Sequence, residues 1–161
     1  MGARHKKRAA RELALLAAYA GDCNGDWDDA VAVVDATGDG AALQADHLAE
    51  LRSVQGARSY ARRLIDAYLE RRAEIDERIE RTSERWRLDR MDRIDRNVLR
   101  LALAEASMDP APPHGVLMSE WVDLASRYGS ERSGGFVNGL LRSTLADPRR
   151  IQDEGDVSGA T

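Results

Sequence analysis

The chain has 161 residues, of which 43% are hydrophobic and 5% aromatic, and Ala, Leu, Arg and Glu dominate its composition. This mixture favours α-helices, because straight-chain residues lose little rotamer freedom in a helix whereas β-branched and aromatic residues prefer strands. No apolar run approaches the roughly 20 residues of a membrane span, and the single Cys23 excludes an intramolecular disulfide, so we expect a cytoplasmic protein without a membrane partner.

The charge is unevenly distributed along the chain. The formal net charge is −4, yet residues 1–11 carry five basic side chains and no acidic one. The other 150 residues carry 19 basic and 28 acidic side chains. A cationic end on an anionic body attracts polyanions locally, which the total charge alone conceals.

In chain order, periodicity first predicts a helix over residues 4–20, with one packed face and one charged face. The Gly, Asp and Asn residues at 21–26 predict a turn, followed by a short helix at 27–36 and a weak stretch after Gly38-Asp39-Gly40. A better helix is predicted at 57–70. Beyond it, Ile75, Ile79 and Trp86 give only a thin apolar stripe in a highly charged segment.

The second half has the strongest helical pattern, at residues 88–107, which ends before Pro110. Ser119 is the expected N-cap of a helix that reaches about Tyr128 and stops at Gly129. A last helix is predicted at 132–146, and residues 147–161 are expected to be a disordered polar tail.

The first helix places Arg4, Lys7, Arg8 and Arg11 within one narrow arc, opposite its small apolar residues. Leu15 and Tyr19 continue the same side one and two turns later. Either a neighbouring helix covers this apolar pair or a partner protein does.

The sequence offers little that indicates catalysis, a metal or a cofactor. The three histidines lack metal-ligand spacing, and the acidic run from Asp22 lacks the glycine and the bidentate Glu of a calcium loop. Glu105 lies on an apolar face, where it is either a perturbed acid or, as we favour, a structural acceptor for backbone N–H groups. An enzyme is therefore not expected.

Three segments together resemble the NusB family of transcription antitermination factors. The first is Lys7-Arg8-Ala9-Ala10-Arg11-Glu12-Leu13-Ala14-Leu15 with Ala18-Tyr19. The second runs from Trp86 to Glu105 and includes Ile94-Asp95-Arg96-Asn97-Val98-Leu99-Arg100. The third joins Ser119-Glu120-Trp121-Val122-Asp123-Leu124-Ala125 to Tyr128-Gly129 and Phe136-Val137-Asn138-Gly139-Leu140-Leu141.

This resemblance implies an all-α fold of two perpendicular three-helix bundles with an extra helix. Residues 1–146 would be a single NusB-like domain, with halves at about 1–70 and 71–146. The resemblance also implies an RNA-binding antitermination factor that binds boxA RNA with NusE, a small-subunit ribosomal protein. Such a factor joins the RNA polymerase antitermination complex and supports ribosomal RNA transcription. Whether the free protein is a monomer or a homodimer stays open.

The residues implied by the resemblance fall into two groups. The expected RNA-binding residues are Arg4, Lys6, Lys7, Arg8, Arg11, Arg132 and Phe136, and the expected NusE contacts are Leu15, Tyr19 and Asp95. Tyr19 could equally be a core tyrosine, and Phe136 could belong to the core. The sequence departs from the family at Ala9 and at Gly134-Gly135, where basic or polar residues are usual, and at Arg132, where an acidic residue is common.

These departures support a second hypothesis. The chain could be a diverged NusB-like module that binds only protein and has lost RNA recognition. The anionic body and Gly134-Gly135 favour this alternative.

Overall fold

The computed structural model describes residues 2–36 and 45–146, and within these ranges it contains helices and no strand. The all-α prediction is confirmed. The predicted tail at 147–161 and the segment around Gly38-Asp39-Gly40 lie outside the described residues. In chain order the elements are α1 (Ala3–Asn24), α2 (Trp27–Asp35), α3 (Ala45–Ser53), α4 (Ala57–Glu70), α5 (Arg72–Thr82), a 3₁₀ turn η1 (Leu88–Arg90), α6 (Arg93–Ala106), α7 (His114–Tyr128) and α8 (Ser133–Ala146).

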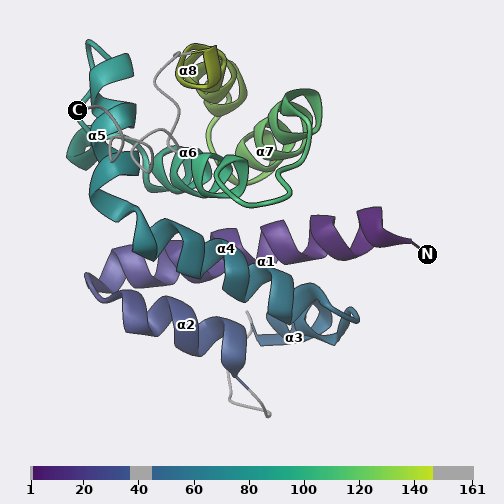
Figure 1. Cartoon of the computed structure of the whole chain (residues 1–161). Coiled ribbons are helices and arrows are strands. Elements are labelled where there is room, and N and C mark those ends of the chain that lie inside the picture. Colours follow the sequence, from purple (N-terminus) through teal and green to yellow (C-terminus); the bar gives the residue numbers. More distant parts are fainter. Residues whose placement is uncertain (1, 37–44, 147–161) are drawn as a thin grey trace, which may run out of the picture.

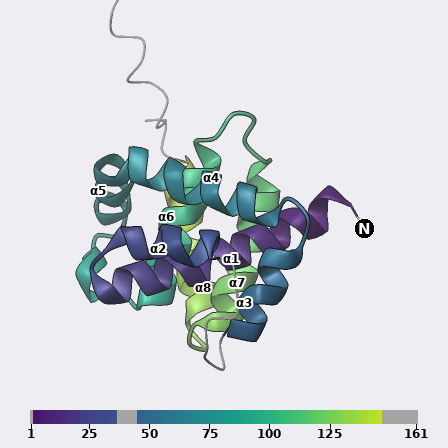
Figure 2. The ribbon, with the colours of Figure 1, turned by 90° about the horizontal axis from the view of Figure 1, so that it is seen from below.

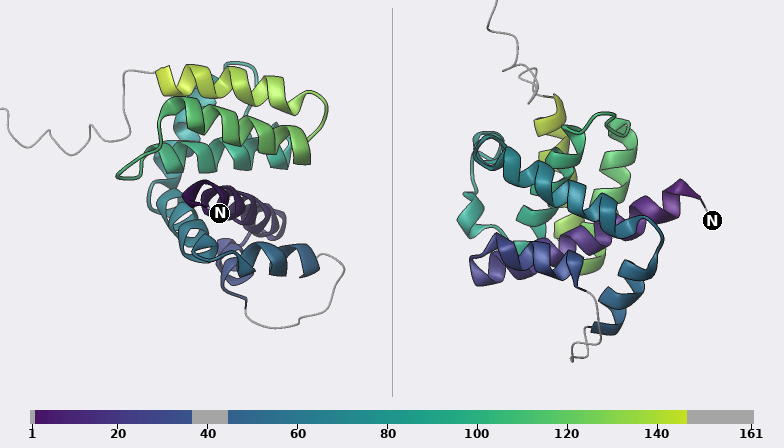
Figure 3. Two further views of the ribbon diagram at one scale, coloured as in Figure 1. Left: turned by 90° about the vertical axis from the view of Figure 1, so that its right-hand side faces the viewer. Right: turned by 60° about the horizontal axis from the view of Figure 1, so that its bottom comes forward.

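The helices form two groups that meet along α1 and α6. Helices α2, α3 and α4 pack against α1 on the side shown in Figure 2. Helices α7 and α8 pack on α6, which also contacts α1 and α4 (Figure 1). When α1 is seen end-on, α7 and α8 run across the picture, so these helices lie roughly perpendicular to α1 (Figure 3). This crossing agrees with the expected perpendicular arrangement, whereas the division near residue 70 stays a prediction.

Helix α1 is longer than its pattern predicts, because it continues through residues 21–24. The turn occurs instead at Gly25, whose φ of 69° is in the left-handed region that favours glycine. Gly21 is helical, and the close approach of α2 favours a residue without a Cβ there, because a Cβ would lie 3.0 Å from the Cβ of Ala30. Small residues in α1 therefore serve close helix packing rather than a turn.

Two predicted helix starts are wrong. The strong pattern at 88–107 contains η1 and a break, and α6 begins only after Asp92, whose side chain accepts a hydrogen bond from the Ile94 N–H. Likewise α7 begins directly after Pro113 rather than at Ser119. Proline has no N–H to donate, so it suits the position before a helix, where that N–H would have no intrahelical partner.

The centre of the molecule holds a buried charged cluster around Glu105, whose side chain is fully covered. Its carboxylate accepts hydrogen bonds from Arg11 Nε at 2.8 Å, Tyr60 OH at 2.5 Å and Trp121 Nε1 at 3.0 Å. These donors come from α1, α4 and α7, and Glu105 itself belongs to α6. Glu105 is thus a structural acceptor, as favoured, but its donors are side chains and not the expected backbone N–H groups.

Side-chain hydrogen bonds at Glu12 connect α3 and α7 to α1. The Glu12 carboxylate accepts from Tyr128 OH, and His47 Nε2 lies 3.2 Å from the same Glu12 oxygen. These contacts hold the C-terminal turn of α7 beside the middle of α1.

Replacing Glu105 by Gln is expected to lower the free energy of unfolding by about 3 kcal/mol, because it leaves the Arg11 guanidinium buried without its counter-charge. Urea unfolding followed by circular dichroism measures the loss. The exposed Glu84→Gln variant makes the same formal change and is expected to differ from wild type by less than about 0.5 kcal/mol. Equal stability of the two variants would contradict the assignment.

Candidate nucleic-acid and partner interface

The N-terminal end of α1 extends beyond the packed body, and the exposed part of the basic segment lies there (Figure 1). Arg4 is exposed, and Lys6, Lys7 and Arg8 are half-buried. These four cations remain accessible to a polyanion, as predicted from the charge distribution.

Arg11 differs from the other predicted RNA-binding residues because it is only 1% exposed. The helical wheel places it in the basic arc, but α6 crosses α1 there, and Glu105 neutralises the charge inside the core. The prediction that Arg11 contacts RNA is therefore wrong. Its charge stabilises the fold.

Two carboxylates of α7 face the outer arginines of α1. Arg8 Nη1 donates to Glu120 at 3.1 Å, and Arg8 Nη2 donates to Asp123. Arg4 Nε lies 3.9 Å from Glu120. The hydrogen bond that Arg8 donates to Asp123 is the main reason that the pKa of Arg8 is raised. A polyanion that binds here must compete with these carboxylates for the arginines.

The predicted apolar patch of Leu15 and Tyr19 is only half present. Leu15 is fully buried in the core, so the prediction that it contacts a partner is wrong. Tyr19, one turn later, is 39% exposed. Four residues advance a helix by 400°, and this 40° offset moves Tyr19 away from the helices that cover Leu15.

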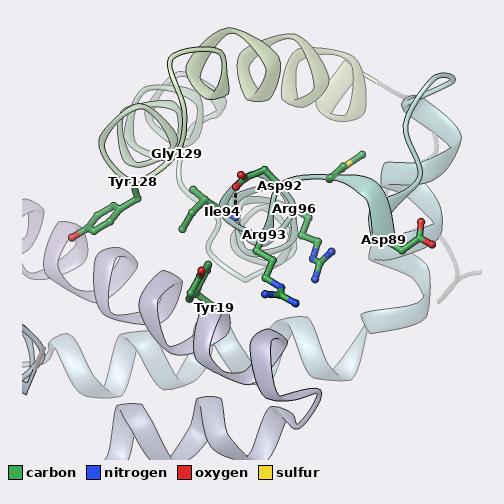
Figure 4. A pocket seen from close by; sticks show the side chains of 9 residues that line it. Tyr19, Asp89, Asp92, Arg93, Ile94, Arg96, Tyr128 and Gly129 are labelled. Atoms are coloured by element: carbon green, nitrogen blue, oxygen red, sulfur yellow. Dashed lines mark hydrogen bonds between the residues drawn. The ribbon is translucent and has the colours of Figure 1, made fainter. Parts of the chain in front are cut away.

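Tyr19, on α1, lines an open hollow of about 510 Å³ beside the start of α6 and the end of α7 (Figure 4). Arg93 and Asp92 contribute from the start of α6, and Tyr128 with Gly129 from the end of α7. The lining is mainly polar, with one exposed aromatic ring at its edge. Such a surface suits a protein partner, because tyrosine combines apolar contact area with a hydrogen-bonding hydroxyl.

Asp95 lies in the first turn of α6, between two residues that line this hollow, and is only 7% exposed. Burial is the main reason that its pKa is raised, and a hydrogen bond from Ser133 at the start of α8 opposes that shift. The Asp95 carboxylate is therefore mostly covered in this structure, and its contact with a partner stays a prediction.

The two remaining predicted RNA residues lie at the start of α8. Arg132 is exposed, and Phe136 is half-buried against the core. Both follow the C-terminal end of α7. Asp123, which pairs with Arg8, lies about 7.5 Å before that end along α7. The predicted RNA residues are thus separated into an α1 group and an α8 group.

The structure explains neither part of the departure at Gly134-Gly135. A Cβ at Gly134 would lie 2.4 Å from Ser126 Oγ on α7, but this hydroxyl belongs to an exposed side chain that can rotate away. Gly135 has open space around its Cβ position.

Sequence reasoning missed a polar cluster that fixes the end of α1 to α6. Asp22 accepts from Arg96 Nε at 2.6 Å and Nη2 at 2.7 Å, and from Asn97 Nδ2 at 2.8 Å. Burial alone would raise the pKa of Asp22, but these hydrogen bonds and the arginine charges lower it overall. The sequence contains no local signal for this pairing, because Asp22 reads as a turn residue.

Most of the described helices lie within a stretch of sequence that matches a known protein family. The model of the NusB family matches residues 8–146, which include both helix groups and the Tyr19 hollow. The chain belongs to the NusB family.

Curated relatives carry the name transcription antitermination protein NusB. The Desulfitobacterium hafniense protein is 32% identical over 93% of this chain and 95% of its own length, and the Clavibacter michiganensis protein is 38% identical over 91% and 98%. The Sorangium cellulosum protein reaches 50% identity, but over 52% of this chain and 60% of that protein. Three relatives are about 50% identical to the chain over the aligned residues, and for these the chain spans about three fifths of their length.

Solved NusB structures have the same arrangement. T. maritima NusB is 30% identical, with a TM-score of 0.68 over 88% of this chain and 91% of that chain. A crystal structure of the antitermination factors NusB and NusE in complex with dsRNA contains a chain that is 27% identical, with a TM-score of 0.65 over 87% of this chain and 96% of that one.

Within residues 2–36 and 45–146, no helix is long and apolar enough to cross a bilayer. In the same ranges, no group of three or more His, Cys, Asp or Glu residues is placed to hold a metal ion.

Replacing Asp22 by Asn is expected to lower the free energy of unfolding at pH 7 by about 2 kcal/mol, because it removes a charged hydrogen-bond acceptor from Arg96. A lowered pKa means that this stabilisation is complete at neutral pH and is lost as the pH falls through the folded-state pKa. The variant should therefore lose less stability than wild type between pH 5 and 2. Urea titrations across this range measure the difference, and parallel acid dependences would contradict it.

Proposed function

We propose that this protein is an RNA-binding transcription antitermination factor. It binds boxA RNA together with NusE and joins the RNA polymerase antitermination complex that supports ribosomal RNA transcription. The observation that carries the proposal is the match of fold and sequence to the NusB chain solved with NusE and dsRNA, which extends over 87% of this chain. The accessible cations of α1 and the Tyr19 hollow supply surfaces of suitable chemistry for both partners.

The expected mechanism divides the two tasks between two regions. Arg4, Lys6, Lys7 and Arg8 contact RNA phosphates, which provides affinity but little sequence preference. Arg132 adds positive charge at the start of α8. NusE contacts the hollow beside Tyr19. When NusE and RNA bind together, the contacts in both regions contribute to the affinity of the complex.

A titration of labelled boxA RNA with the purified protein, with and without NusE, tests this function. Binding that is tightest when NusE is present supports it. Absence of RNA binding in both conditions overturns it.

Replacing Arg4, Lys6, Lys7 and Arg8 together by Ala is expected to weaken RNA binding about 100-fold at low salt. Each lost phosphate contact should also reduce the slope of log K against log salt by about 0.7. Fluorescence anisotropy at several salt concentrations measures both effects, and an unchanged melting temperature shows that the fold persists. Unchanged RNA affinity would show that these four residues are not the RNA contact. A wild-type protein that binds NusE but no RNA would favour the second candidate function.

That second candidate is a NusB-like module that binds protein but not RNA. The pairing of Arg8 with Glu120 and Asp123 favours it, because those carboxylates neutralise part of the basic segment.

Tyr19→Ser is expected to weaken NusE binding about tenfold, because it removes the exposed aromatic ring at the hollow. RNA binding without NusE should stay at the wild-type level. Calorimetric titration with NusE measures the affinity, and the similarly exposed Val116→Ser on α7 serves as a control. Equal NusE affinity of wild type and the Tyr19 variant would place the partner elsewhere.

A further inference from the structure

The two flanks of the N-terminal part of α1 differ in how their charges are balanced. On the flank that faces α7, the cations Arg4 and Arg8 lie opposite the carboxylates of Glu120 and Asp123. This flank has no excess charge. The other flank faces α4, and its charge comes from a different set of residues.

On the α4 flank, two cations share one aromatic ring. Lys7 Nζ lies 5.6 Å from the centroid of the Tyr60 ring, and Arg63 Cζ lies 5.7 Å from the same centroid. Lys6 lies beside them, with its stem over the start of α4, where a Cβ on Gly56 would be 2.5 Å from Lys6 Cδ. Residues from α1 and α4 thus form one cationic edge.

No carboxylate neutralises this edge in the described part of the chain. Neither α1 nor α4 has an acidic residue in its first turn. Lys6, Lys7 and Arg63 form no ion pair with a described residue, whereas the adjacent Arg62 is paired with both Asp35 and Asp66. The excess positive charge of the N-terminal region is therefore concentrated between α1 and α4.

Tyr60 holds the edge in a fixed position. Its hydroxyl donates to the buried Glu105, and its ring is 8% exposed. A cation over an aromatic ring is attracted by the electrons of the ring face and keeps its full charge. Lys7 and Arg63 are thus positioned without being neutralised, unlike Arg8.

We propose that Lys6, Lys7 and Arg63 form a phosphate-binding subsite, so that the RNA strand runs along the edge between α1 and α4. The proposal rests on the proposed RNA-binding function and adds Arg63, which lies outside the family's N-terminal basic segment. The edge carries none of the exposed large hydrophobic residues found among the described residues, namely Tyr19, Trp86 and Val116. Charge without apolar surface matches a nucleic-acid backbone better than a protein partner.

Arg63→Gln tests the subsite with the full-length protein and boxA RNA. The expected result is about fivefold weaker RNA binding at low salt and a salt slope reduced by about 0.7, the value for one phosphate contact. Arg63→Lys keeps the charge and should keep the wild-type slope. Arg85→Gln makes the same charge change after α5, at the opposite end of the molecule from the α1 N-terminus, and should alter neither quantity (Figure 1).

The outcomes separate this proposal from the function on which it rests. If wild type binds RNA and Arg63→Gln binds equally well with an equal slope, the subsite is wrong and the antitermination function stands. Equally weakened RNA binding in Arg63→Gln and Arg85→Gln also overturns the subsite, because RNA affinity would then depend on the net charge of the protein and not on the position of Arg63. If wild type binds no RNA in the presence of NusE, the proposed function itself fails. Thermal unfolding of each variant confirms that the fold is intact.

Discussion

The structure depends on one buried carboxylate that joins four helices. Glu105 on α6 accepts hydrogen bonds from α1, α4 and α7, and each donor is a different kind of side chain. A buried charge is costly unless it is paired and hydrogen-bonded. Because Arg11 supplies the pairing, the crossing of α1 and α6 is fixed at the point where the two helix groups meet.

The same carboxylate connects the core to the surface. Its bond to the Tyr60 hydroxyl orients the ring on which Lys7 and Arg63 lie. Neighbouring basic residues in one short segment consequently have three different environments. Arg11 is neutralised in the core, Arg8 is paired with carboxylates at the surface, and Lys7 keeps an unbalanced charge.

The sequence was sufficient to predict the helical class and the helices at 57–70 and 132–146, because their apolar spacing is regular and glycine or proline marks neighbouring turns. It could not separate Arg11 from Arg8. Both lie in one arc of the wheel, and only the crossing of α6 over α1 covers one of them. The same limit explains Leu15, whose burial depends on neighbouring helices, and Asp22, whose partners are more than 70 residues away. Helix starts were also missed where the structure uses Asp92 and Pro113.

The extension of α1 beyond the packed body has a consequence for how this protein can evolve. Its outer turns carry charge and make few core contacts, whereas its inner turns are buried on several sides. Substitutions in the outer turns can change affinity for a polyanion at little cost to folding. Substitutions from Arg11 onward act first on stability, so selection for binding and selection for the fold act on separate parts of one continuous helix.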